Sequence, residues 1–280
     1  RVELGKSSTE FGNWLPCRKH SCRAPTSFAD VVTKLPREKE CTEYKVQIAK
    51  HPFSKGECRA AFYARIHTEG KYPWKNVILK TYLHEDFQKQ KELYHEEVET
   101  QAVAKYFAEQ WMNTEEGRRG KSIRFISSDV LCVAQPDGTE AWYFMEEKLP
   151  APKSGAEPFE KFTNNGRMAK QEHPDILKFS RWSNEATSGI MMITDLQGVD
   201  SAGGGYVLTD PAVLCEDTDR FGSTNFNPHA LGECLEAVEG ALKESLPQPP
   251  PPPLHGELGG ASAAIMLIAA GSPTPCTVSS

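Results

Sequence analysis

The sequence predicts a two-lobed α+β fold, in which a β-rich first lobe carries one long helix and the second lobe is mixed. Apolar residues alternate in three early segments, 44–50, 58–66 and 76–83, as is typical of half-buried strands. Residues 84–113 then carry apolar residues at helical spacing. Three prolines within 149–158 exclude a central strand or helix there, so they are expected to separate the two lobes.

The first lobe is expected to span residues 41–148. Before it, residues 1–40 mix charges with Gly, Pro and Ser without sustained periodicity, which predicts a flexible N-terminal arm. Within it, residues 123–134 and 141–145 predict two strands, and the sequence Pro136-Asp137-Gly138 between them favours a hairpin turn.

The second lobe is expected to span residues 149–246. Pro174 limits the start of a helix, and residues 189–199 predict an apolar strand whose C-terminal end carries an acid, an amide and a glycine. The remaining segments are expected to form two short loops and a final helix, namely 206–211, 221–225 and 230–246.

Residues 247–280 predict a proline-rich, low-complexity tail. All residues from 247 to 253 are proline except Gln248, which favours an extended polyproline II conformation. Such a segment is a candidate ligand for a partner protein that recognises proline in an aromatic groove.

The overall composition favours a globular protein that binds neither nucleic acid nor membrane. The 280 residues are 39% hydrophobic, which is sufficient for a core. The net charge of -6 argues against a surface that neutralises phosphates or anionic lipid. The apolar run 261–270 is much shorter than the roughly 20 residues of a membrane-spanning helix. No leader sequence is recognised at Arg1, so a cytoplasmic location is expected.

The eight cysteines form no evident disulfide framework and are expected to be reduced thiols. Cys17, His20 and Cys22 resemble half of a metal site, but the distance to Cys41 fits no known zinc ribbon or finger. Incidental thiols are therefore the favoured interpretation.

Four residues carry the chemistry that the pattern suggests. Lys80 ends the apolar run 77–79, so a strand could hold its ammonium group near phosphate oxygens, although a solvated lysine at a strand end is the commoner case. Asp195, Gln197 and Asp210 offer hard oxygen ligands of the kind that Mg²⁺ prefers. For either aspartate motif taken alone, ordinary turn chemistry is the favoured interpretation.

The glycine-containing sequence at 222–225 could present backbone amides to an anion, but it lacks the lysine and spacing of a phosphate-binding loop. The chain also contains no HRD, DFG or GxGxxG sequence, which excludes an ordinary protein kinase by its own signatures.

Eight segments, in order along the chain, resemble the alpha-kinases, an atypical protein kinase family. They are HPFSKGECRAAFYARI (51–66), VILK (77–80), YHEEVETQAVAKYFAEQWMN (94–113), WYFMEE (142–147), FEKFTNNG (159–166), ITDLQGV (193–199), TDP (209–211) and RFGSTN (220–225).

The resemblance implies a two-lobed protein-kinase-like fold and an ATP-dependent protein serine/threonine kinase that acts with Mg²⁺ on a protein substrate. It also implies roles for individual residues. Asp195 would be the catalytic aspartate, and Gln197 and Asp210 would hold Mg²⁺. The nucleotide contacts would be Lys80 and Arg59 on the phosphates, Glu146 on adenine, and the backbone of Gly222, Ser223, Thr224 and Asn225.

One departure from the family pattern concerns its structural zinc. Arg181 stands in the FSRW segment where the family has a histidine ligand, and only His229 and Cys234 remain of the later ligand cluster. The structural zinc is therefore doubtful in this chain. The alternative interpretation is a pseudokinase, or a nucleotide-binding interaction module, that has lost the zinc site.

Overall fold

The structure is a computed structural model that describes residues 9–35, 41–67, 74–225 and 229–245. Its first part is a seven-stranded sheet in the order β2-β1-β7-β8-β5-β4-β3. The strands are β1 (Phe11–His20), β2 (Thr42–Ala49), β3 (Ser54–Lys55), β4 (Arg59–His67), β5 (Trp74–Tyr82), β7 (Ser128–Ala134) and β8 (Glu140–Glu147). The predicted strands at 44–50, 58–66, 76–83 and 141–145 are confirmed.

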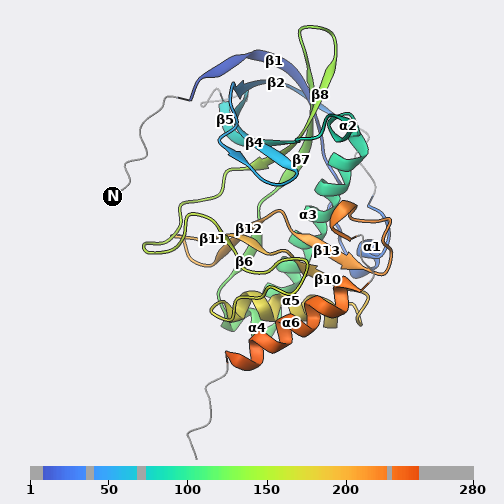
Figure 1. Cartoon of the computed structure of the whole chain (residues 1–280), viewed down its shortest axis with the longest axis vertical. Coiled ribbons are helices and arrows are strands. Elements are labelled where there is room, and N and C mark those ends of the chain that lie inside the picture. The colour runs from blue at the N-terminus through green and yellow to red at the C-terminus, as the bar shows by residue number, and fades with distance from the viewer. Residues whose placement is uncertain (1–8, 36–40, 68–73, 226–228, 246–280) are drawn as a thin grey trace, which may run out of the picture. The chain divides into compact units, whose positions relative to one another are not determined.

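The sheet closes into a barrel because β2 pairs with β4 as well as with β1 (Figure 1). Side chains alternate along each strand, so every second residue faces the interior. Leu79 and Met145 belong to the buried cluster inside the barrel. Their neighbours Lys80 and Glu146 therefore lie on the outer surface of the barrel.

The long helix predicted for residues 84–113 is confirmed as α3 (Lys91–Met112), preceded by the short helix α2 (Glu85–Gln88). Its buried face includes Val98, Val103, Phe107 and Trp111, as the apolar stripe predicts. The helix packs against barrel strands β7 and β8 and also against β6 and α5 of the second part.

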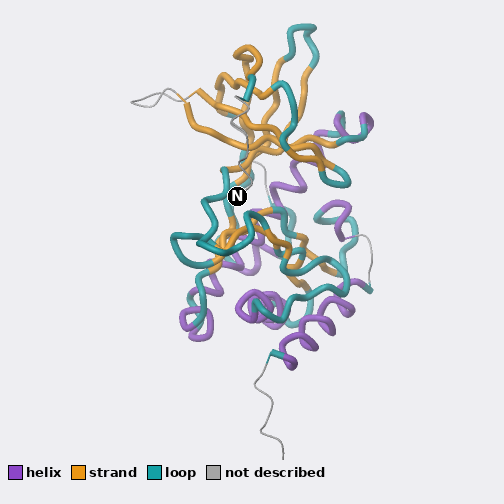
Figure 2. Tube along the Cα trace, turned by 60° about the vertical axis from the view of Figure 1, so that its left-hand side comes forward, coloured by secondary structure: helices purple, strands orange, loops and turns teal. Residues whose placement is uncertain are grey.

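The second part contains a four-stranded sheet in the order β6-β12-β11-β9, a two-stranded sheet of β10 and β13, and flanking helices (Figure 2). The strands are β6 (Ile123–Phe125), β9 (Glu160–Lys161), β10 (Met191–Thr194), β11 (Gln197–Asp200), β12 (Tyr206–Thr209) and β13 (Ala212–Cys215). The helices are α4 (Glu115–Arg119), α5 (Pro174–Ala186), the 3-10 turn η1 (Gly222–Asn225) and α6 (Ala230–Glu244). The predicted start of a helix at Pro174 is confirmed.

The expectation of an N-terminal arm without regular structure is wrong for residues 11–20. This segment is strand β1, which pairs with β2 along most of its length and with β7 from Cys17 to His20. Pro16 lies outside the β7 pairing, where its missing N–H costs no ladder bond on that side. A second ordered segment follows as helix α1 (Phe28–Val31).

Three predicted boundaries within the later chain are also wrong. Residues 123–134 form two strands in different sheets, β6 and β7. The expected strand 189–199 is divided into β10 and β11, because Asp195 adopts a left-handed backbone with φ of 52°. Residues 206–209, expected in a loop, form the buried strand β12.

Within the described residues, no helix combines the length and the apolar character needed to cross a bilayer. The tail predicted for residues 247–280 lies outside the described residues.

Candidate active site

Lys80 lies at the centre of a buried charged cluster between the barrel and the second part. Its ammonium nitrogen is 2.7 Å from Asp210 Oδ2 and 2.7 Å from Glu146 Oε1. The exposed fractions of the Lys80 and Glu146 side chains are 11% and 5%. Glu146 also accepts a hydrogen bond of 2.6 Å from the Thr209 hydroxyl. Two barrel strands and the turn after β12 thus hold one cation between two acids.

Arg59 extends this cluster to helix α3. Its guanidinium lies 3.4 Å from Asp210 Oδ1 and 3.1 Å from Glu97 Oε2. The Tyr82 hydroxyl donates to the other oxygen of Glu97 at 3.1 Å. Asp210 is therefore shared between two cations, both of which come from the barrel.

Asp195 and Gln197 lie beside Asp210. The Gln197 side-chain nitrogen donates to the Asp210 backbone carbonyl at 3.0 Å and to Asp195 Oδ2 at 3.4 Å. The other Asp195 oxygen lies 2.7 Å from the Lys161 ammonium. Both aspartates have positive φ, 52° at Asp195 and 48° at Asp210, a strained conformation that is concentrated at functional sites.

Burial and neighbouring charge shift the pKa values of the two aspartates in opposite directions. Burial raises the pKa of Asp195, and the nearby Lys161 only partly opposes this effect. Burial would also raise the pKa of Asp210, but the charges of Arg59 and Lys80 outweigh it and hold that pKa at about 2. Asp195 is thus the better proton acceptor, and Asp210 is a permanent anion at neutral pH.

The two remaining charged groups of the cluster are also perturbed. Burial raises the pKa of Glu146, although Lys80 opposes it. Burial lowers the pKa of Lys80, but Asp210 and Glu146 more than compensate, so that its pKa lies above the ordinary lysine value. Lys80 is therefore charged at neutral pH.

The oxygen atoms of this cluster fit a hard cation such as Mg²⁺. Buried Oδ1 atoms of Asp195 and Asp210 accept no hydrogen bond, although each lies near a cation. Carboxylates of this kind, together with substrate phosphates, are the usual Mg²⁺ ligands. Gln197 contributes its amide nitrogen to its described bonds, so its amide group would have to turn before its oxygen could bind a metal.

The structure brings six of the ten predicted site residues into one connected cluster: Arg59, Lys80, Glu146, Asp195, Gln197 and Asp210. Both Glu146 carboxylate oxygens are already bonded to protein groups, so its contact with adenine stays a prediction. The predicted contacts at Gly222 to Asn225 also stay predictions. The Asn225 side chain bonds to the backbone of Cys215, Asp217 and Arg220.

Sequence reasoning missed three participants in this cluster: Glu97, Thr209 and Lys161. Glu97 lies on the expected helix, but helical periodicity does not indicate which of its polar residues faces a distant arginine. Thr209 and Lys161 lie within the motif segments 209–211 and 159–166, but the resemblance was not used to assign them a role.

The residues at the family's zinc positions have other contacts. Arg181 forms an ion pair with Glu185 along helix α5. The Cys234 thiol donates to the Gly166 carbonyl at 3.0 Å and lies in an apolar cluster with Leu177. In the described part of the chain, no three His, Cys, Asp or Glu side chains are grouped so that they could hold a metal ion. The absence of the zinc stays a prediction.

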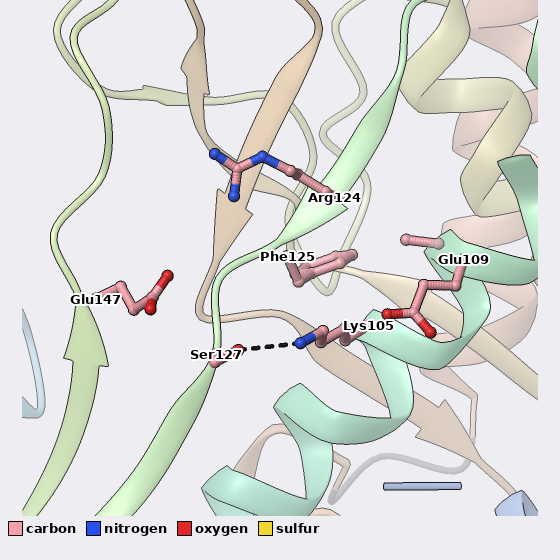
Figure 3. Close-up of a pocket in the computed structure, with 7 residues that line it drawn as sticks. Lys105, Glu109, Arg124, Phe125, Ser127 and Glu147 are labelled. Carbon is pink, nitrogen blue, oxygen red and sulfur yellow. Dashed lines mark hydrogen bonds between the residues drawn. The ribbon is translucent and has the colours of Figure 1, made fainter. Parts of the chain in front are cut away.

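A separate cavity of about 310 Å³ lies among α3, β6 and β8 (Figure 3). Lys105 and Arg124 line it together with Ser127 and Glu147, and Lys105 donates to the Ser127 hydroxyl at 3.0 Å. None of its lining residues belongs to the charged cluster around Lys80.

A barrel with one long helix, joined to a mixed second part at a buried lysine and two acids, has the architecture of a two-lobed protein kinase. A model of the alpha-kinase family matches residues 54–236, which is 183 of the 280 residues. The chain belongs to the alpha-kinase family.

Two curated relatives come from Dictyostelium discoideum. Alpha-protein kinase vwkA is 32% identical over 189 residues, which cover 64% of this chain and 27% of the relative. Myosin heavy chain kinase C is 26% identical over 198 residues, covering 68% and 22%. The chain therefore spans about a quarter of the length of these relatives.

Solved structures show the same fold. The alpha-kinase domain of myosin-II heavy chain kinase A in complex with AMP-PNP matches with a TM-score of 0.63 at 19% identity, over 83% of this chain and 96% of that one. The complex of that domain with ADP matches with a TM-score of 0.60 at 19% identity, over 81% and 97%. The two-lobed fold predicted from the sequence is confirmed.

Proposed function

We propose that this chain is an ATP-dependent protein serine/threonine kinase that transfers the γ-phosphoryl group of ATP to a protein hydroxyl with the help of Mg²⁺. The observation that carries the proposal is the buried Lys80 ammonium group, 2.7 Å from both Asp210 and Glu146. Family membership and nucleotide complexes of the similar kinase A domain support it.

The charge of the cluster suits a polyphosphate. Lys80 and Arg59 both contact Asp210 when no nucleotide is bound. Phosphate oxygens would replace Asp210 as partners of these cations, which would free the Asp210 carboxylate. When bound there, Mg²⁺ would be held by Asp210 and Gln197 and would neutralise part of the phosphate charge.

Asp195 is proposed to receive the proton of the attacking hydroxyl group. A bond forms between the substrate oxygen and the γ-phosphorus, while the bond from that phosphorus to the β–γ bridging oxygen breaks and ADP leaves. Burial raises the pKa of Asp195, which favours proton acceptance. Lys161, 2.7 Å from Asp195 Oδ1, would keep the carboxylate in place.

The test measures transfer of labelled γ-phosphate to a generic basic protein in the presence of Mg²⁺. We expect the wild-type chain to be active and Asp195→Asn to lose about 10²–10⁴-fold in rate while still binding ATP. Lys80→Met should lose both activity and ATP affinity. Lys75→Met is the matched control, because Lys75 lies on the same strand in an exposed ion pair.

The alternative is a pseudokinase that binds nucleotide without catalysis, and the loss of the zinc ligand at Arg181 is the observation that favours it. Calorimetry and the transfer assay together decide between the two. ATP binding without any wild-type transfer would support the pseudokinase, and no ATP binding at millimolar concentration would contradict both proposals. The proline-rich segment 247–253 remains a proposed ligand for a proline-recognising partner.

A further inference from the structure

Between the barrel strands β1 and β2, the chain enters the core of the second part within residues 28–35. The two strands are neighbours in the barrel, yet Val31 and Leu35 are only 0% and 6% exposed and belong to the core cluster of the second part. Phe28, at the start of α1, packs against the rings of Tyr106 and Phe107 on α3. Residues 27–35 are called the strap below.

Arg220 fastens the strap to α3. Its guanidinium donates to the Val31 and Thr33 carbonyls at 2.6 Å each and to Glu99 Oε1 at 2.9 Å. Glu99 accepts a further bond of 3.0 Å from the Leu35 backbone N–H. Arg220 is 7% exposed and Glu99 is 5% exposed. One buried side chain thus connects three distant segments.

The turn that follows Arg220 is strained and tightly held. Phe221 and Gly222 have φ of 66° and 70°, and a left-handed conformation is rare for an aromatic residue. Asn225 closes the turn by donating to the Arg220 carbonyl at 3.1 Å and accepting from the Cys215 N–H at 2.9 Å. A turn of this kind keeps its shape only while the surrounding bonds persist.

The chemistry of the pair indicates a positional role. A buried ion pair contributes little net stability compared with apolar packing, because both charges lose their hydration. The planar arginine fork, however, fixes the directions of its donors and hence the positions of its acceptors. Here these acceptors are two strap carbonyls and a carboxylate on α3.

We propose that Arg220, Glu99 and the strap are positioning elements of the nucleotide site. They hold the backbone of residues 222–225 where it contacts ATP, and none of them touches the nucleotide. The inference rests on the proposed function, in which that turn approaches ATP. It assigns a part in nucleotide binding to the segment before β2, which precedes the matched family region of 54–236.

The first test is Arg220→Lys, which keeps the charge opposite Glu99 but removes the fork. We expect the Kd for AMP-PNP, measured by calorimetry on protein shown to be folded, to rise about tenfold or more. The KM for ATP should rise in parallel, while kcat stays within about threefold. Arg167→Lys is the control, because Arg167 forms an exposed ion pair with Glu233. A folded Arg220→Lys variant with wild-type Kd would overturn the inference.

Hydrogen exchange of the wild-type chain, with and without AMP-PNP and Mg²⁺, decides the matter even if Arg220→Lys does not fold. The inference expects nucleotide to slow amide exchange in residues 27–35 together with 220–225. Slower exchange in β5 and β8 without any change in the strap would overturn this inference alone. No slowing anywhere, together with no calorimetric binding, would overturn the proposed function as well.

Discussion

The two sides of the Lys80 cluster are built in different ways. The barrel supplies Lys80 and Glu146 from regular strands, in which Ile78 pairs with Glu146 and Lys80 pairs with Phe144. The second part supplies Asp195 and Asp210 from positions where the chain leaves a strand with positive φ. Sheet register places the first pair, whereas strained turns place the second.

The side chains on the two sides of the cluster are therefore held in place by different interactions. A side chain on a paired strand keeps its place as long as the ladder persists, because its direction follows from the alternation of the strand. A side chain at a left-handed turn depends on the groups that hold the turn in place. The free energy of unfolding should therefore be sensitive mainly to loss of charge on the barrel side, and mainly to changes in backbone geometry in the second part.

The largest expected effect is that of Lys80→Met on stability. The substitution leaves the buried carboxylates of Asp210 and Glu146 without their shared cation, so we expect the free energy of unfolding to fall by about 3–5 kcal/mol in urea titrations. Lys75→Met on the same strand should change it by less than about 1 kcal/mol, because that pair is exposed. Equal effects at the two positions would contradict the importance of the buried cluster.

The substitution Gly205→Ala tests how strongly the second part depends on its backbone geometry. Gly205 has φ of 74°, and a Cβ there would overlap Ser122. We expect a loss of about 3 kcal/mol or more, from conformational strain and overlap together. Gly204→Ala is the matched control, since Gly204 has φ of 91° but open space around it, and it should cost only about 1 kcal/mol. Thermal unfolding of both variants would measure the difference.

Asp210 in the second part and Glu146 on the barrel should change the free energy of unfolding in opposite directions as the pH rises. The Asp210 pKa of about 2 lies below the ordinary value, so this group stabilises the fold above about pH 4 and loses that contribution as the pH falls towards 2. The contribution is about 2 kcal/mol. Burial raises the pKa of Glu146, so its contribution instead declines as the pH rises.

Urea midpoints between pH 2 and pH 7 would measure both contributions. Asp210→Asn should flatten the loss of stability below pH 4, whereas Glu146→Gln should remove the decline in stability that the Glu146 carboxyl causes as the pH rises above about 4.5. If both variants changed the profile in the same direction, the assignment of charge within the cluster would be wrong.

The smallest effect should come from Thr209→Val, which removes the 2.6 Å hydrogen bond that joins β12 to Glu146 on the barrel. A hydrogen bond to a buried carboxylate of this kind contributes about 1.5–3 kcal/mol, and the loss should lie at the lower end of that range because Lys80 still pairs with Glu146. Thr139→Val, whose hydroxyl donates to exposed Asp137, is the control and should change the unfolding free energy by less than about 0.5 kcal/mol.

The parts that local sequence determined are those with a sustained period. Strands β2, β4 and β5 and helix α3 follow from alternation or from helical spacing, because burial of one face imposes that period on the sequence. Lys80 could be assigned to the predicted strand 76–83 for the same reason, although it lies within β5 and not at its end. Their oxygen-bearing side chains grouped Asp195, Gln197 and Asp210 as candidate Mg²⁺ ligands, and the resemblance then implied the same residues.

Other features were decided only by tertiary structure. Strand β12 is four consecutive buried residues, so it has no alternation that could distinguish it from a loop. Strand β1 contains Pro16 and charged residues, and only its pairing with β2 and β7 reveals it. The contacts of Arg59 with Glu97 and of Arg220 with the strap join residues 38 and 187–189 positions apart. Local periodicity records which face of an element is buried, but not which distant group that face will meet, and this is why the long-range contacts of the cluster required the folded chain.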